Sequence, residues 1–175
     1  GTLHALSFLH LATRESNDHT GPSPTLGAAL VFSGPGRYYQ TGRSGPLPEG
    51  IVNECSIAVI GATGAVGQVF LRILEERDFP ASSIRLCASE RSVGKRITVG
   101  GRELTVEEAT PELLAEVDFA FISAGGGVSR EIAPMAVQQG ATVVDKSSAF
   151  RMDADVPLVV PEINGDDLRH HRGIV

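Results

Sequence analysis

Short apolar runs alternate with amphipathic stretches through the second part of the chain. Continuous apolar runs that contain β-branched residues predict buried strands at 56–60, 84–88, 119–122 and 142–145. Between these runs, apolar residues recur at intervals of three and four, which predicts helices at 66–74 and 128–136. Strands that alternate with helices are typical of βαβ units, so the pattern predicts a parallel sheet.

Turn and capping residues refine this picture. The Gly100-Gly101 pair joins two short apolar stretches, 97–99 and 104–106, and predicts a hairpin. Thr110 followed by Pro111 is typical of a helix start. We therefore predict an α/β fold of the Rossmann-like, doubly wound class, with a mostly parallel sheet and helices on both faces.

The later part of the chain gives weaker signals. Pro134 is expected to kink or divide the helix that ends before Gly140. Residues 156–161 form a further extended apolar stretch, and residues 162–165 predict a turn. The last residues, 173–175, predict the start of a strand whose partners are missing.

The first 50 residues differ from the rest. They hold half of the 10 prolines and 8 of the 20 glycines, and no apolar period there is long enough to bury a face. We interpret residues 1–50 as a mostly disordered leader, either a transit peptide or a non-native stretch, and residues 51–175 as the folded domain. Because the chain lacks an initiator Met and ends abruptly at Val175, we expect a fragment.

Composition excludes several classes of protein. A net charge of −6 argues against nucleic acid as the main partner, because phosphate binding needs a basic surface. The apolar runs fall short of the ~20 residues that a membrane helix needs. Two cysteines, Cys55 and Cys87, are too few for a disulfide scaffold, and Cys87 is expected to be a buried small hydrophobe. The sequence shows no metal-ligand cluster, so we expect no metal.

A glycine-rich turn lies between the first predicted strand and the first helix. Gly61, Gly64 and Gly67 form G-x-x-G-x-x-G, a close variant of the dinucleotide fingerprint, in the strand–turn–helix context that the fingerprint requires. Gly61 permits a sharp turn, Gly64 permits close approach of a pyrophosphate, and Gly67 permits close packing of helix on strand. The helix N-terminus supplies N–H donors, so the turn predicts binding of a dinucleotide.

The residues after the second strand bear on the choice of nucleotide. Glu90 is placed to hold a ribose 2′-hydroxyl, as in NAD-binding proteins. Arg91, Ser92 and Lys95 instead suit a 2′-phosphate, although Lys95 in particular is equally well explained as a solvated charge. We favour NADP over NAD.

Two later loops also follow predicted strands. Residues 123–127 are small and permit close approach of a cofactor at a strand end. In the loop after residue 145, Arg151 is suited to clamp a phosphate or carboxylate. Pairing of Arg151 with Asp153 or Asp155 explains it equally well on spacing alone.

Residues 55–175 closely resemble the N-terminal cofactor domain of the aspartate-semialdehyde dehydrogenase family. The motifs that carry the resemblance are Ala58 to Gly67, Ala88 to Ser92, Phe121 to Gly126, Ser147 to Met152, and Asp155 to Glu162. Their order and spacing are specific to the family. The resemblance covers everything after the leader but only about the first third of a family chain.

The resemblance implies an oxidoreductase that uses NADPH to reduce L-4-aspartyl phosphate to L-aspartate 4-semialdehyde and phosphate. This step leads to lysine, methionine and threonine. The resemblance implies that Arg151 binds the substrate phosphate and that Arg91 and Ser92 meet the 2′-phosphate. It also implies that the following residues contact the pyrophosphate or border the cofactor: Thr63, Gly64, Ala65, Val66, Ser123, Ala124 and Gly125.

The chain departs from the family in two respects. Lys146 stands where the family commonly has Asn. The resemblance also implies that the family's nucleophilic cysteine follows just beyond the position of Val175, with the base histidine and the carboxylate-binding arginine further on. We therefore expect no catalytic residue in this chain, weak NADP binding and no activity of the chain alone.

Two alternatives stay open. The domain could come from a related N-acyl-glutamyl-phosphate reductase, or it could be a non-catalytic NADP-binding module. The expected partners are NADP(H) and an acyl-phosphate substrate, and the parent enzyme is expected to be a homodimer or homotetramer. We expect a cytoplasmic location, or a plastid if the leader is a transit peptide.

Overall fold

The computed structural model describes residues 30–32, 38–40 and 55–175. Most of the predicted leader, and with it the expectation of disorder there, lies outside the described residues. Within it, β1 (Leu30–Phe32) and β2 (Tyr38–Gln40) pair antiparallel.

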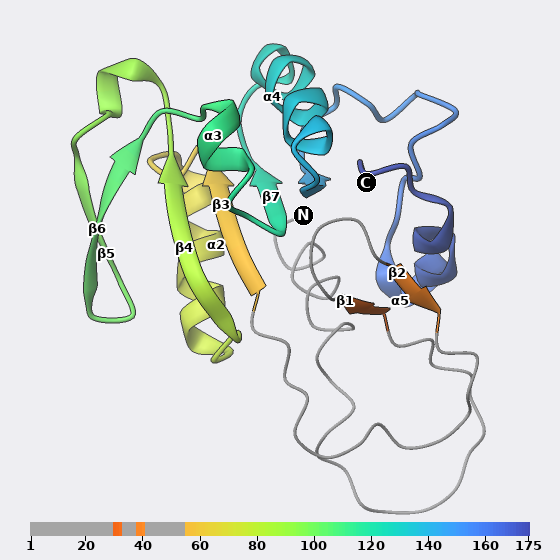
Figure 1. Ribbon diagram of the computed structural model, residues 1–175, viewed down its shortest axis with the longest axis horizontal. Coiled ribbons are helices and arrows are strands. Elements are labelled where there is room, and N and C mark those ends of the chain that lie inside the picture. The colour runs from red at the N-terminus through yellow and green to blue at the C-terminus, as the bar shows by residue number, and fades with distance from the viewer. Residues whose placement is uncertain (1–29, 33–37, 41–54) are drawn as a thin grey trace, which may run out of the picture.

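A six-stranded sheet forms the centre of the domain (Figure 1). The strand order is β5-β6-β4-β3-β7-β8, and only the β5–β6 pair is antiparallel. The strands are β3 (Cys55–Ile60), β4 (Ala81–Cys87), β5 (Arg96–Val99), β6 (Arg102–Glu107), β7 (Phe119–Ile122) and β8 (Thr142–Asp145). The predicted mixed, mostly parallel sheet is thus confirmed, including its hairpin.

The helices connect these strands as the pattern predicted. The longer ones are α2 (Ala65–Glu76) and α4 (Gly126–Gln138), and the short ones are α3 (Pro111–Leu114) and α5 (Pro161–Asn164). Two 3₁₀ helices, η1 (Glu90–Ser92) and η2 (Gly165–His170), complete the set. The predicted start of α3 is confirmed, because the Thr110 hydroxyl accepts a hydrogen bond from the Leu113 N–H at 3.3 Å.

Alternate side chains of the strands pack on opposite faces of the sheet, because successive residues of a strand point to opposite sides. Ile57 and Val59 belong to a core cluster with Phe70, Leu71 and Leu74 of α2. Their neighbours Ala58 and Ile60 belong to a second cluster with residues of α3 and α4, which include Leu113, Leu114, Ile132, Ala133 and Ala136. Helices therefore cover both faces, as the doubly wound prediction requires.

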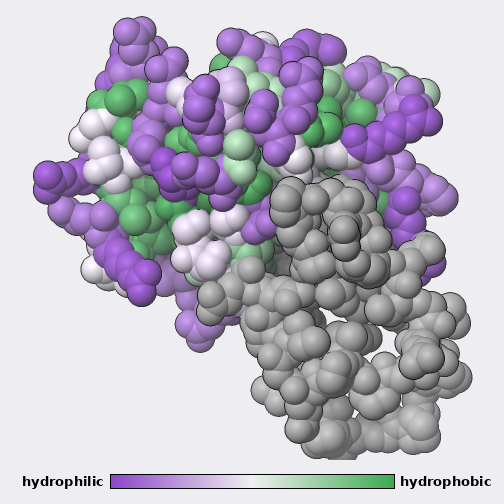
Figure 2. All heavy atoms as spheres, in the orientation of Figure 1, coloured by the Kyte–Doolittle hydropathy of each residue, from purple (hydrophilic) through white to green (hydrophobic). Residues whose placement is uncertain are grey.

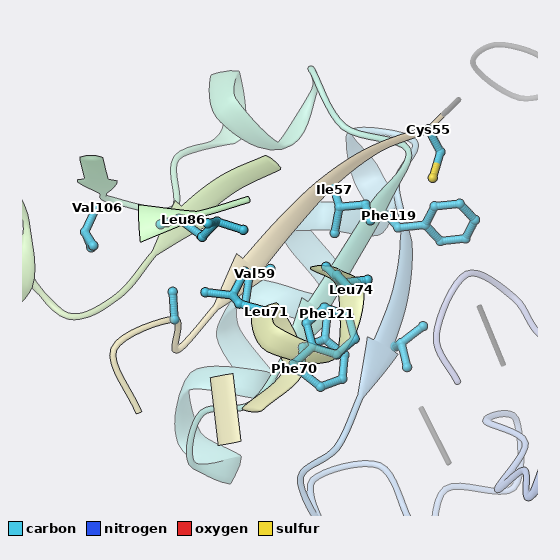
Figure 3. Packing of buried hydrophobic residues seen from close by; sticks show 13 residues of the cluster. Cys55, Ile57, Val59, Phe70, Leu71, Leu74, Leu86, Val106, Phe119 and Phe121 are labelled. Atoms are coloured by element: carbon cyan, nitrogen blue, oxygen red, sulfur yellow. The ribbon is translucent and has the colours of Figure 1, made fainter. Parts of the chain in front are cut away.

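An aromatic pair anchors α2 on the sheet (Figure 3). The rings of Phe70 and Phe121 stack with centroids 3.7 Å apart and an interplanar angle of 8°. Such a pair contributes about 0.5–1.5 kcal/mol beyond its area burial. This contact fixes α2 beneath β7 and sets the position of the turn that precedes the helix.

The structure corrects two predictions about the end of the chain. Residues 173–175 do have a partner: Ile174 pairs in parallel with Val143 of β8, and the Val143 N–H donates to the Gly173 carbonyl at 2.7 Å. Residues 162–164 lie in α5 rather than in a simple turn, since Pro161 at the first helical position favours a helix.

Pro134 lies inside α4 and does not divide the helix.

The visible face of the described region is mostly polar, with apolar side chains showing near β4 and the β5–β6 hairpin and again near α4 (Figure 2). Three of the large exposed apolar residues follow β8: Met152, Leu158 and Ile163 are 91%, 63% and 82% exposed. None of the described helices is long and apolar enough to cross a membrane.

Candidate functional site

The chain reverses its direction across the sheet between β3 and β7. From β3 it proceeds to β4 and β6 on one side, and it then returns to place β7 and β8 on the other side. In doubly wound sheets, ligands bind at the carboxyl ends of the strands at such a reversal. The loops after β3 and β7 are therefore the expected place for a ligand, and the arrows of β3 and β4 in Figure 1 point toward this end of the sheet.

Gly61 makes the close approach of these two loops possible. Its φ is +87°, a conformation that favours glycine, and a Cβ there would lie 2.8 Å from the Ser123 carbonyl oxygen. Ser123 is tied to the same place, because its N–H donates to the Ile60 carbonyl at 2.9 Å and its hydroxyl at 3.3 Å. The predicted residues of the two loops are thus brought together.

Gly64 and Gly67 occupy different environments in the turn. A Cβ on Gly67 would lie 2.3 Å from the Gly61 carbonyl oxygen, so the turn packs directly on the helix backbone. Gly64 is exposed, and a Cβ there would lie 3.3 Å from the same oxygen. The close packing predicted at Gly67 is thus present, whereas the approach of a pyrophosphate to Gly64 stays a prediction.

The N-terminus of α2 faces this turn without a side-chain cap. Gly64 is the N-cap residue, it has no side chain to cap the helix, and the first turn of α2 contains no acidic residue. Thr63, Gly64 and Ala65 are exposed, and Val66 is half-buried. Uncapped N–H donors and the positive end of the helix dipole fit an anionic group, so the residues present fit a dinucleotide pyrophosphate.

The side chain of Gln68 holds the turn from within α2. Its Nε2 donates to the Ala62 carbonyl at 2.7 Å. On the other side, the N–H groups of Gly61 and Ala62 donate to the Cys87 carbonyl at 2.8 and 3.0 Å. The sequence did not predict this role of Gln68, because only its polarity, directly after the third glycine, indicates a contact with the turn.

Arg91 and Ser92 lie in η1, directly after β4. Arg91 is exposed and finds no hydrogen-bond or ion-pair partner among the described residues. Ser92 is only 7% exposed, and its hydroxyl accepts from the Lys95 ammonium at 3.3 Å. The structure thus brings Lys95 to Ser92 and leaves the Arg91 guanidinium free to meet a ligand.

The segment after β7 leads into the N-terminus of α4. Ser123 and Ala124 are half-buried, and Gly125 is the exposed N-cap residue. As in α2, no side chain of the described region caps α4, and its first turn contains no acidic residue. This second uncapped helix start lies at the carboxyl end of the strand next to β3.

The loop after β8 is held by an unusually complete set of hydrogen bonds. The Asp145 carboxylate accepts from the Ser129 hydroxyl at 2.9 Å, from the Ser147 N–H at 3.0 Å and from the Ser147 hydroxyl at 2.7 Å. Arg130 donates to the Ala149 carbonyl at 2.6 Å. Sequence reasoning missed Ser129 and Arg130, although a fully buried serine on the apolar face of a helix is a usable signal of a polar contact.

Arg151 lies at the end of this loop and lines a hollow of about 240 Å³. It is exposed and has no ion pair among the described residues. Asp155, one of the two partners that spacing allowed, pairs with Arg172 at 3.2 Å instead. The guanidinium therefore stays available for an anion.

Neither cysteine is suited to act as a nucleophile. Burial raises the pKa of both Cys55 and Cys87 to about 12, so the thiolate is scarce at neutral pH. This agrees with the prediction that Cys87, which is fully buried, packs as a small hydrophobe. The described residues contain no group of three or more His, Cys, Asp or Glu side chains that could hold a metal ion.

Comparisons with known proteins point to one family. A family model described as the semialdehyde dehydrogenase NAD-binding domain matches residues 56–171. An aspartate-semialdehyde dehydrogenase of Bacillus subtilis is 54% identical over 119 residues, which are 68% of this chain and 34% of that protein. The enzyme of the same name from Aquifex aeolicus is 51% identical over 114 residues, 65% of this chain and 34% of that protein.

Solved structures agree with this result. An aspartate semialdehyde dehydrogenase II of Vibrio cholerae, complexed with ASA, has a TM-score of 0.67 at 42% identity and aligns over 70% of this chain and 40% of that one. An aspartate semialdehyde dehydrogenase of Candida albicans with NADP has a TM-score of 0.57 at 30% identity, over 66% of this chain and 36% of that one.

The chain spans about a third of the length of the curated relatives that it matches. Over that third, the strand order, the glycine turn and the sequence identity all indicate the same cofactor-binding domain. The chain therefore belongs to the semialdehyde dehydrogenase family, and residues 56–171 form its domain for binding a nucleotide cofactor.

Proposed function

We propose that this chain is the cofactor-binding part of an aspartate-semialdehyde dehydrogenase that uses NADPH. The reaction proposed for the whole protein is the reduction of L-4-aspartyl phosphate to L-aspartate 4-semialdehyde, with release of phosphate. The observation that carries the proposal is the glycine turn at the sheet reversal, together with the N-terminus of α2 that follows it and has no side-chain cap among the described residues. The names of the relatives support the choice of substrate.

The glycine turn and the neighbouring loop after β7 each have a role in this proposal. The N–H groups at the start of α2 bind the pyrophosphate, and the absence of a Cβ on Gly64 leaves room for it. Ser123, Ala124 and Gly125 border the cofactor from the neighbouring loop, because Gly61 lets the two loops meet. When bound, the cofactor supplies the hydride.

Arg91 decides between the two nicotinamide cofactors in this proposal. Its guanidinium, which has no partner among the described residues, follows β4, where the fingerprint places contacts to the adenine ribose. A 2′-phosphate offers it a charge-assisted, bidentate partner that a 2′-hydroxyl does not offer. Ser92 and Lys95 lie beside it and hold the loop through their mutual hydrogen bond.

Arg151 binds the phosphate of the acyl-phosphate substrate in this proposal. It lies in the loop after β8, on the far side of β7 from the glycine turn. Because both cysteines are buried with raised pKa values, neither is proposed as a nucleophile of the reaction. The chain itself therefore binds and orients, and it does not carry out the chemical step.

The cofactor proposal is tested by titrating NADPH and NADH into the chain and into Arg91→Ala by calorimetry. We expect the substitution to weaken NADPH binding about tenfold, the worth of one charge-assisted hydrogen bond, and to change NADH binding little. Arg102→Ala is a matched control, since Arg102 is an exposed arginine on the β5–β6 hairpin. Equal losses for the two cofactors would contradict the assignment to the 2′-phosphate.

A further inference from the structure

The hollow beside Arg151 is lined by a second cationic residue, Lys146, and by many apolar residues. One wall consists of the loop after β8, which contributes Asp145, Lys146, Ser147, Phe150 and Arg151. The other lining residues are apolar and comprise segment 156–161 together with Val144 and Val175. Two cationic residues thus line a small, largely apolar space.

Lys146 is fixed at this place by the backbone. Its N–H donates to the Ile122 carbonyl at 3.0 Å, so the residue is held beside the end of β7. The side chain is half-buried, and it has no hydrogen-bond or ion-pair partner among the described residues. Lys146 lines the hollow together with apolar residues, so its positive charge is available to an anion bound there.

Three other charged side chains in this part of the structure are already engaged, those of Asp145, Arg130 and Arg172. Asp145 accepts three hydrogen bonds from Ser129 and Ser147, which stabilise its charge within the loop. Arg130 donates to the Ala149 carbonyl, and its guanidinium lies 5.8 Å from the centroid of the Phe150 ring. Arg172 pairs with Asp155 at 3.2 Å. Lys146 and Arg151 are therefore the two cations lining the hollow that lack an anionic partner in the described structure.

We propose that Lys146 is a second anion-binding residue that acts with Arg151 and makes the hollow selective for a dianionic phosphate group. This inference rests on the proposed function of Arg151 as the ligand of the substrate phosphate. A guanidinium binds two oxygens in a fixed plane, whereas an ammonium acts as a compact point charge with three donors. Together they match the two charges of a phosphate or acyl-phosphate dianion.

The test measures binding of inorganic phosphate, and of nitrate as a monoanion, to the 175-residue chain. Amide NMR shifts of residues 146–151 separate this site from the glycine turn and from the Arg91 loop. We expect Lys146→Asn to weaken phosphate binding about tenfold and nitrate binding much less, because the second charge of the ligand loses its partner. Lys146→Arg should retain phosphate affinity within about threefold, since it keeps the charge.

Control variants keep the outcome interpretable. Arg96→Gln removes one positive charge from an exposed site on β5, where Arg96 pairs with Glu103, and should leave phosphate binding unchanged. The thermal unfolding midpoint of each variant checks that the domain is folded, and Lys146→Met repeats the charge loss with a second side chain.

The results separate the two assignments. If Arg151→Met abolishes phosphate binding while Lys146→Asn binds like the unsubstituted chain, the inference about Lys146 is wrong and Arg151 keeps its role. If the unsubstituted chain shows no saturable shift of residues 146–151, or if Arg151→Met binds equally well, the assignment of Arg151 fails and that of Lys146 fails with it. Equal losses of phosphate and nitrate would overturn the selectivity for a dianion.

Discussion

Gly64 and Gly67 lie three residues apart in one turn, yet an added methyl group would meet different surroundings at each. At Gly67 the methyl would collide with the backbone of the turn itself, 2.3 Å from the Gly61 carbonyl oxygen. At Gly64 it would lie 3.3 Å from that atom, a contact that a small shift can relieve. At the scale of single residues, Gly67 therefore serves the packing of α2, whereas Gly64 leaves the space that the proposed pyrophosphate needs.

This difference predicts the stability of a variant. We expect Gly67→Ala to lower the free energy of unfolding by about 1–3 kcal/mol or more, because neither the strand exit nor the helix can move without losing core contacts. Urea denaturation measures the change. The control is Gly127→Ala in α4, where no atom lies within 4 Å of the added Cβ, and helix propensity should stabilise the fold by about 0.5–1 kcal/mol. Equal stability of Gly67→Ala and the unsubstituted chain would contradict the packing role.

Helix α4 connects the two loops of the candidate site at the scale of elements. Its uncapped N-terminus follows Gly125, and its first turns carry Ser129 and Arg130 to the loop after β8. Arg130 both donates to the Ala149 carbonyl and lies over the Phe150 ring. One element thus supports the proposed cofactor border and the loop that carries Arg151.

Removing the Arg130 contacts should loosen that loop and little else. We expect Arg130→Met to speed amide hydrogen exchange in residues 146–151 by about fivefold, a loss of about 1 kcal/mol, while exchange in β3 and α2 stays unchanged. Arg72→Met is the matched control, because Arg72 is exposed on α2 and has no side-chain partner among the described residues. Unchanged exchange in residues 146–151 would show that the Arg130 contacts do not hold the loop.

The elements that sequence predicted correctly are those whose signal is local. The apolar run of β7, the helical spacing of α2 and the Thr110-Pro111 cap all sit within a few residues of the structure they specify. One error is local, since residues 162–164 lie in α5 and not in a simple turn. The other features that sequence did not predict are distant contacts. Ile174 pairs with Val143, a neighbour in space that no local pattern reveals, and the Ser129–Asp145 bond likewise spans two elements.

At the scale of the whole molecule, the reversal of strand order between β3 and β7 gathers the candidate residues at one edge of the sheet. The loops after β3 and β4 carry Gly64 and Arg91, and the loops after β7 and β8 carry Gly125 and Arg151. Sequence could predict these residues one loop at a time, because each follows an apolar strand. It could not predict the Lys146 environment, which depends on the apolar segment 156–161 folding back across the hollow.

Calorimetric titration of NADPH into the 175-residue chain and into its Gly64→Val variant tests whether the glycine turn binds the pyrophosphate of NADPH. We predict saturable one-to-one binding by the unsubstituted chain and loss of binding in Gly64→Val, with the variant still folded by circular dichroism, because the valine side chain occupies the phosphate path. Binding of equal affinity in Gly64→Val, or no binding by the folded unsubstituted chain, would mean that the glycine turn does not hold the pyrophosphate.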